Sequence, residues 1–356
     1  MSPTNPFHTP RLLMLPILVL ALMLAFTACD DNPADSNDDD NPSQTGSIIA
    51  VAGDETLTLF NADSKTWQQP QGLGLGANWM TRIGDSLYVV NSLSNTLQRF
   101  DISNRTAEPA GELDIGLSEN RSPYASLAFR DSLLLISNLQ WNSITVVNVN
   151  KWKVVDDWEV NIAPVELLTG FDQVYVVHSK YDFNDFTFNT GSVWKLGPNG
   201  ALLDSLTVGV NPQFAHYTYP GEIHVVCTGN YDDIPGTVYV LTLFPIQTER
   251  IINIGYSPGR STVDKDDHVV YLAAGGWSNE GDEEGLVLRY DYDSLEPMQP
   301  ISASLGVVDV AYDSTSGLLY AACRDGMRLD VFDDGQKVGS YELSDPPNAI
   351  EVLYAE

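Results

Sequence analysis

The feature that most constrains this chain is a short pattern that recurs seven times along it. Each copy begins with an apolar run that ends in a small or polar residue, and the clearest copy is Leu-Tyr-Val-Val-Asn at 87–91. The seven runs start at residues 48, 87, 133, 174, 223, 269 and 318, so neighbouring copies lie 39 to 49 residues apart. This period is typical of a repeat in which each unit is one four-stranded propeller blade.

Two of the four strands of each predicted blade can be recognised directly as apolar runs in the sequence. A second apolar run follows each first run, as 96–101 follows 87–91. Runs such as 174–177 and 269–272 are apolar throughout, as expected for strands that neighbouring sheets cover on both faces. We therefore predict an all-β fold, a seven-bladed β-propeller that occupies residues 47–356 as one domain.

The two ends of the repeat region complement each other. The first repeat, which starts at Ser47, has no inner strand, whereas the segment 347–354 reads as an inner strand without a blade. Because closure removes free sheet edges, we predict that the C-terminal strand closes the first blade. Cys227 and Cys323 hold equivalent positions two blades apart, which exceeds the roughly 7 Å between Cα atoms that a disulfide allows. We expect two buried free thiols.

The residues before the repeats predict export and lipid anchoring. Arg11, an apolar segment at 12–26 and small residues before Cys29 are typical of a signal peptide, and the apolar segment is short for a membrane span. The segment Leu-Ala-Phe-Thr-Ala-Cys at 24–29 resembles the lipobox of bacterial lipoproteins. This resemblance implies a lipoprotein signal peptide at 1–28 and lipidation of Cys29. Ordinary cleavage of a soluble secreted protein is the alternative.

Residues 29–46 predict a flexible acidic tether. The segment 30–43 has six aspartates and no large apolar residue, so it cannot bury enough surface to fold. Acidic runs after a lipidated cysteine resemble a surface-export signal, whereas aspartate directly after the cysteine implies inner-membrane retention in other lipoproteins. We expect a bacterial cell envelope location, with the outer membrane or cell surface favoured over the inner membrane.

The charge of the chain excludes one class of partner. The formal net charge is −30, and a surface this negative repels phosphate backbones, so we expect no nucleic-acid binding. The same field favours cationic ligands or metal ions, although a solubilising surface is the simpler explanation.

The segment Tyr-Val-Val-Asn at 88–91, with Asn95, Thr96 and Asp101, resembles the Tyr-Val-Thr-Asn motif of the YVTN-repeat propellers. These are seven-bladed extracytoplasmic proteins, and similar signals stand at 136–147 and 236–240. The resemblance implies the fold but no single activity, because its members include binding proteins and enzymes. Some similar surface lipoproteins deliver nutrients such as corrinoids to outer-membrane transporters.

A binding site is expected on the face where the loops between second and third strands meet the loops between blades. The loops at 179–190, 229–235 and 275–284 are the longest and mix aromatic residues with carboxylates, which suits a planar, sugar-like or cationic ligand. The alternative is that these loops pack their own aromatics. Arg121 and Phe214 are also expected around the opening. The candidate ligand-binding residues are Trp79, Tyr124, His178, Tyr181, Asp185, Tyr231, Asp232, Arg260 and Trp277.

Three functions remain open from sequence. The first is a non-catalytic binding module for a small molecule, glycan or protein, including nutrient capture for an outer-membrane transporter. The second is an enzyme, since lactonases and quinone-dependent dehydrogenases resemble this fold, and Glu166, Asp309 or Glu351 would act at the pore. The third is a protein–protein scaffold. We predict no cofactor, although calcium could bind the oxygen-rich segments 182–185 or 232–233.

Overall fold

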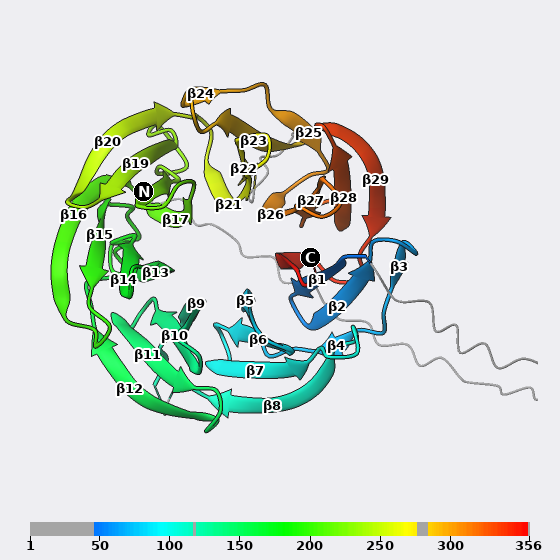
Figure 1. The fold of residues 1–356 in the computed structure, drawn as a ribbon, viewed down its shortest axis with the longest axis horizontal. Helices are drawn as coiled ribbons and strands as arrows, with labels where there is room; N and C mark the ends of the chain where they lie inside the picture. The colour runs from blue at the N-terminus through cyan, green and yellow to red at the C-terminus, as the bar shows by residue number, and fades with distance from the viewer. Residues whose placement is uncertain (1–45, 117–118, 276–283, 355–356) are drawn as a thin grey trace, which may run out of the picture. The chain divides into compact units, whose positions relative to one another are not determined.

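The computed structural model describes residues 46–116, 119–275 and 284–354, and all the regular structure in these ranges is β-strand. Seven antiparallel sheets follow one another around a ring (Figure 1), which confirms the predicted seven-bladed β-propeller. The predicted leader and almost all of the tether lie outside the described residues, and so does Trp277. Within the described part of the chain, no helix is long and apolar enough to cross a membrane.

Each blade has four strand positions, which we give from the first blade to the seventh. The innermost strands are β30 (Pro347–Val352), β5 (Ala77–Ile83), β9 (Pro123–Phe129), β13 (Pro164–Gly170), β17 (Pro212–Tyr217), β21 (Pro258–Asp264) and β26 (Val307–Asp313). The second strands are β1 (Ile48–Gly53), β6 (Ser86–Asn91), β10 (Leu133–Asn138), β14 (Gln173–His178), β18 (Glu222–Cys227), β22 (Val269–Ala274) and β27 (Leu318–Cys323).

The outer half of each blade completes the sheet. The third strands are β2 (Thr56–Asn61), β7 (Thr96–Asp101), β11 (Ser143–Asn148), β15 (Thr190–Leu196), β19 (Thr237–Leu243), β23 (Gly285–Asp291) and β28 (Arg328–Asp333). The outermost strands are β3 (Thr66–Trp67) with β4 (Gln71–Gly72), β8 (Glu108–Asp114), β12 (Lys153–Glu159), β16 (Leu202–Val210), β20 (Ile246–Asn253), β24 (Glu296–Pro297) with β25 (Ile301–Ala303), and β29 (Gln336–Glu342).

The core lies between neighbouring blades. Tyr88 and Val90 of β6 pack with Leu134 and Ile136 of β10 in one buried cluster that spans the second and third blades. The second and third strands are therefore covered on both faces, which explains why their sequences are apolar throughout instead of alternating. Burial of apolar area at every blade interface is the main force that holds the ring.

The C-terminal strand closes the ring. β30 pairs with β1 in antiparallel register, with Ala50 opposite Glu351 and Ala52 opposite Ala349. The Leu353 N–H donates to the Ile48 carbonyl at 2.8 Å and extends this pairing. The predicted closure of the first blade is confirmed, and both Cys227 and Cys323 are buried free thiols as expected.

Candidate functional site

The innermost strand of every blade is irregular near its start. In all seven sheets the pairing between the first and second strands shifts register there. In the second blade Ala77 pairs with Asn91 and Trp79 with Val90, so Asn78 has no partner residue opposite it. A bulge of this kind redirects a side chain out of the sheet pattern. The corresponding interruptions hold Tyr124, Val165, Gln213, Gly259, Val308 and Asn348.

These interruptions build a cavity on one face of the propeller, which we call the face pocket. Its volume is about 510 Å³, within the range of small-molecule sites. Residues from the loops between second and third strands complete its wall, so it lies on the face that the sequence predicts. The polar side chains that define it are Asn78, Tyr124, Gln213, Tyr231, Arg324 and Asn348.

Hydrogen bonds fix the side chains on one wall of the face pocket. The Asn78 Nδ2 atom donates to the Tyr124 carbonyl at 2.9 Å, and the Tyr124 hydroxyl donates to Gln213 Oε1 at 2.9 Å. Gln213 Nε2 in turn donates to Asn211 Oδ1 at 2.8 Å. This wall is therefore preorganised, because each group holds the next in place.

Arg324 fixes a second group of side chains at the face pocket. Its Nη1 donates to Asn348 Oδ1, and its Nη2 donates to Asp54 Oδ2 at 2.9 Å. Asn348 Nδ2 donates to the other Asp54 oxygen at 3.1 Å, so the three side chains form a closed ring of contacts. Asp54 lines an adjoining shallow hollow and is not among the residues that line the face pocket.

Arg260 separates the face pocket from a second cavity along the propeller axis, the channel cavity, of about 650 Å³. The guanidinium carbon lies 4.5 Å from the ring centre of Trp79 and 5.8 Å from that of Phe214. Its Nη1 donates to Asp309 Oδ2 at 3.1 Å, and its Nη2 donates to the Asn78 carbonyl. Stacking and hydrogen bonding together fix this cation between the two cavities.

The channel cavity gathers the three carboxylates that the sequence proposes for catalysis, Glu166, Asp309 and Glu351. Burial raises the pKa of Glu166 to about 8, and the N–H of Leu167 and the Arg260 charge only partly oppose it. Burial and the Asp309 charge raise the pKa of Glu351 to about 7. Burial also raises the pKa of Asp309, because the loss of hydration outweighs the nearby Arg260.

A buried polar chain that the sequence did not reveal leads away from the channel cavity. His216 Nδ1 lies 2.7 Å from Ser261 Oγ, and its Nε2 lies 3.1 Å from the Tyr290 hydroxyl. That hydroxyl lies 2.6 Å from His224 Nδ1, and His224 Nε2 lies 3.1 Å from Glu222 Oε1. His216 and Ser261 line the cavity, so the chain connects it with a partly exposed carboxylate. His216 and His224 occur in paired strands at opposite positions, which is the signal that sequence reading could have used.

Several candidates from the long loops lie near the face pocket. Tyr231, 47% exposed, lines the pocket, and its ring centre lies 5.2 Å from that of Phe188. Phe188 also contacts Tyr181, at 5.1 Å between ring centres. The aromatic residues of the fourth and fifth blades therefore pack against each other and present one ring to the cavity. Asp185 and Asp232 are exposed and are not among the residues that line it.

The oxygen-rich loop segments are held by local hydrogen bonds. Asp182 Oδ1 accepts the Asn184 N–H at 2.8 Å, and Asn230 Oδ1 accepts the Asp232 N–H at 3.1 Å. Among residues 46–116, 119–275 and 284–354, no three His, Cys, Asp or Glu side chains are grouped so that they could hold a metal ion.

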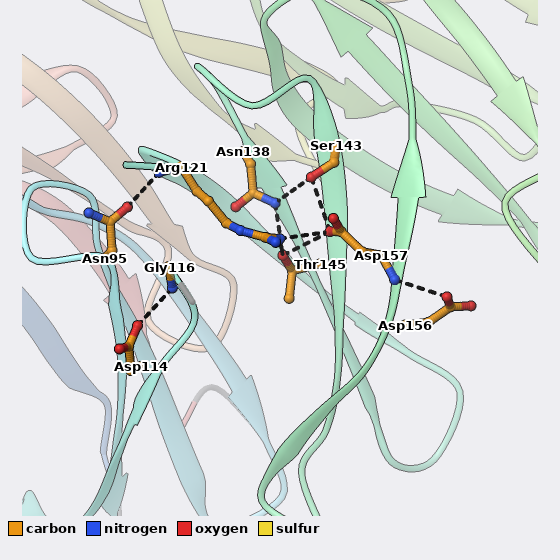
Figure 2. A network of polar contacts seen from close by, with 9 residues as sticks. All are labelled: Asn95, Asp114, Gly116, Arg121, Asn138, Ser143, Thr145, Asp156 and Asp157. Atoms are coloured by element: carbon orange, nitrogen blue, oxygen red, sulfur yellow. Dashed lines mark hydrogen bonds and ion pairs between the residues drawn. The ribbon is translucent and has the colours of Figure 1, made fainter. Parts of the chain in front are cut away.

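Two residues expected at the opening lie inside blades instead. His178 is 0% exposed at the end of β14, its ring centre is 5.1 Å from that of Trp194, and burial lowers its pKa to about 3. Arg121 points into the third blade, where its Nη1 donates to Asp157 Oδ1 at 3.0 Å and to Thr145 Oγ1 at 3.1 Å (Figure 2). Both side chains therefore contribute to blade structure, whereas Trp79, Tyr124, Tyr231 and Arg260 line the two cavities.

Comparison with solved structures gives the fold. A functionally unknown protein from Desulfotomaculum acetoxidans matches 88% of this chain and 100% of its own, with 15% identity and a TM-score of 0.68. A Bacteroides fragilis protein that carries the provisional name 6-phosphogluconolactonase matches over the same shares, with 12% identity and a TM-score of 0.68. Apo AztD from Citrobacter koseri matches 86% of this chain and 97% of its own, with 10% identity and a TM-score of 0.56.

No protein-family model matches the sequence, and no curated protein matches it. At these identities the structural similarities establish the propeller fold and carry no information on activity.

Proposed function

We propose that this protein is a non-catalytic binding module that takes a small polar molecule into the face pocket. The observation that carries the proposal is the convergence of fixed amide, phenol and guanidinium groups from different blades on one cavity of about 510 Å³. These groups recognise hydroxyl, carbonyl or acid oxygens by hydrogen bonding. The exposed ring of Tyr231 and the Phe214 ring add apolar area, which is the usual composition of a small-molecule site.

The leader supports a location for this module. A lipidated Cys29 followed by an acidic tether would hold the propeller at a bacterial envelope membrane, as a YVTN-like surface or periplasmic protein. Capture of a nutrient for an outer-membrane transporter is consistent with that location. Replacement of Cys29 with serine is expected to abolish labelling with an alkyne fatty acid and to move the protein into the soluble envelope fraction. Unchanged labelling would contradict lipidation of this residue.

Native mass spectrometry of the purified fragment 46–356 tests the binding function. We expect a small molecule that is retained by the wild type and lost from Tyr124→Phe and Gln213→Ala, because these substitutions break the preorganised wall. Tyr219→Phe is the matched control: this tyrosine is in the turn between β17 and β18, and it does not line the face pocket. Equal retention by Tyr124→Phe, Gln213→Ala and the control would contradict binding at the face pocket.

A specific observation supports an enzyme as the second candidate. Glu166 is buried in the channel cavity with its pKa raised to about 8, which suits a general acid or base near neutral pH. Two structural neighbours carry the provisional name 6-phosphogluconolactonase. Hydrolysis of 6-phosphogluconolactone that falls at least about a hundredfold in Glu166→Gln would support this candidate. Hydrolysis at the uncatalysed rate by the wild type would count against lactonase activity.

A further inference from the structure

The charged side chains that line the face pocket are opposite in sign to the net charge of the protein. The chain has 48 Asp and Glu residues against 18 Lys and Arg. Nevertheless, no carboxylate is among the described residues that line the pocket, whereas two arginines are. A pocket built for a cationic ligand would place carboxylates on its walls, because an unpaired buried cation is costly. The lining therefore argues against the cationic ligand that the overall charge favours.

We propose that the face pocket binds a small hydroxylated organic acid with one carboxylate, and that Arg324 recognises that carboxylate. This inference rests on the proposed binding function. Both arginines donate from both terminal nitrogens to protein groups, so exposure distinguishes them, and only 10% of the Arg260 side chain is exposed. The Arg324 side chain is 32% exposed and is held in place by Asn348 and Asp54. It is the guanidinium that an entering ligand can reach.

The contacts of Arg324 also indicate how many negative charges the ligand carries. Among the described residues that line the pocket, Arg324 alone has an accessible guanidinium, and Asp54 already neutralises part of its charge. A phosphate dianion would add a second charge without a partner in a strongly acidic protein. A single carboxylate matches the fork geometry of arginine and carries one charge.

The amide and phenol side chains of the face pocket indicate that the ligand carries hydroxyl groups. Asn78, Gln213 and Tyr124 offer groups that donate and accept hydrogen bonds, and hydroxyls do both. The volume of about 510 Å³ admits a molecule of the size of one or two sugar rings.

Calorimetry with matched probes tests this inference on the fragment 46–356. We expect glucuronate, gluconate or quinate to bind at least roughly tenfold more tightly than glucose, and glucose 6-phosphate to bind more weakly than the acids. Arg324→Gln is expected to remove the preference for the acid. Asp54→Asn is expected to strengthen acid binding and leave glucose binding unchanged, because it removes the competitor for Arg324.

Arg328→Gln is the matched control, since Arg328 forms a similar exposed pair with Glu342 outside the pocket. Equal or tighter binding of glucose or of the phosphate would overturn the inference while leaving the binding function intact. No binding of any acid, together with a retained molecule that mass spectrometry identifies as lacking a carboxylate, would also overturn it. No retained molecule and no probe binding would contradict both proposals, and this outcome is distinct from the others.

Discussion

Arg260 and Asp309 join the innermost strands of the sixth and seventh blades through a 3.1 Å contact from Nη1 to Oδ2. The same oxygen accepts the Ile350 N–H of the first blade at 2.9 Å. The remaining oxygen accepts the Val310 N–H at 2.8 Å. One buried carboxylate therefore connects three blades at the point where the ring closes.

Asp309→Asn is expected to lower the free energy of unfolding by about 2–4 kcal/mol, because it leaves the buried Arg260 without its anion. Urea denaturation of the fragment 46–356 measures this loss. Asp172→Asn serves as the control, since it breaks the exposed pair between Arg130 and Asp172 and is expected to cost less than about 1 kcal/mol. Equal losses of unfolding free energy in the two variants would show that the Arg260–Asp309 contact stabilises the fold no more than an exposed ion pair does.

Glu166 makes stability fall as pH rises. Its pKa is about 8 in the folded protein against 4.5 for an ordinary glutamate, so the folded state keeps a proton that the unfolded state releases. Between pH 4.5 and 8 the wild type should lose roughly 2–4 kcal/mol more than Glu166→Gln, which cannot titrate. Urea midpoints of both proteins at pH 5, 6, 7 and 8 measure how stability changes with pH. Parallel curves for the two proteins would contradict a protonated Glu166.

His178, in contrast to Glu166, makes stability fall as pH decreases. Burial lowers its pKa to about 3 from 6.5, so the unfolded state takes up a proton below pH 6.5 that the folded state refuses. Stability that is complete above pH 6.5 should decrease as the solution becomes more acidic. His178→Phe is expected to weaken this acid-side decrease, as thermal unfolding from pH 7 to pH 4 would show. If the two proteins lose the same stability between pH 7 and pH 4, the titration of His178 does not cause the loss and the prediction is wrong.

A chain that ends at residue 346 is expected to lose cooperative unfolding, because β30 and the buried Leu353 complete the first blade. Circular dichroism and size-exclusion chromatography measure the loss, and a synthetic peptide of residues 347–356 should restore folding in part. Ile350→Val, which keeps the strand, should cost no more than about 1.5 kcal/mol. A truncated chain with an unchanged unfolding midpoint would contradict the structural role of this strand.

The two thiols should react only after unfolding. Cys227 is buried, and burial raises the pKa of its thiol to about 12; burial also raises the pKa of the Cys323 thiol. The thiolate is the reactive form, so a thiol reagent should label neither residue in the native fragment and both in denaturant. Rapid labelling of either cysteine in the native protein would contradict this arrangement.

The architecture was predictable because its signals are local. Strands such as β7 and β27 have the bounds that the apolar runs indicate, since burial on both faces leaves an uninterrupted apolar sequence. The closing strand was predictable from one missing and one surplus inner strand. Both inferences need only the period and the composition of the repeats.

The site was predictable only in part, because side-chain direction depends on bulges that the period does not reveal. His178 occupies the same strand position as Asn91 and Asn138, and all three are fully buried. That position could have been recognised as internal from the polar partners Thr96 and Ser143 on the next strand. Arg121 likewise has its anion, Asp157, in the outermost strand of the blade that follows it in sequence.

The composition of the face pocket was not predictable from any one segment. Asn78 and Gln213 lie at the register shifts of two inner strands, whereas Arg324 lies in the loop after β27, and the three blades are far apart in sequence. The residue that follows the first position of each inner strand is a shared signal, because it falls at the register shift in every blade. Reading that position across all the repeats would have identified Asn78, Tyr124, Gln213 and Asn348 but neither of the two lining arginines.

The pairing of β1 with β30 has a consequence for biosynthesis. Ile49 lies opposite Val352, so the earliest strand of the propeller waits for a strand that is synthesised after all six other blades. Until then the nascent chain has an open seam, and the emergence of β30, not of any one complete blade, marks the moment at which the native propeller can form.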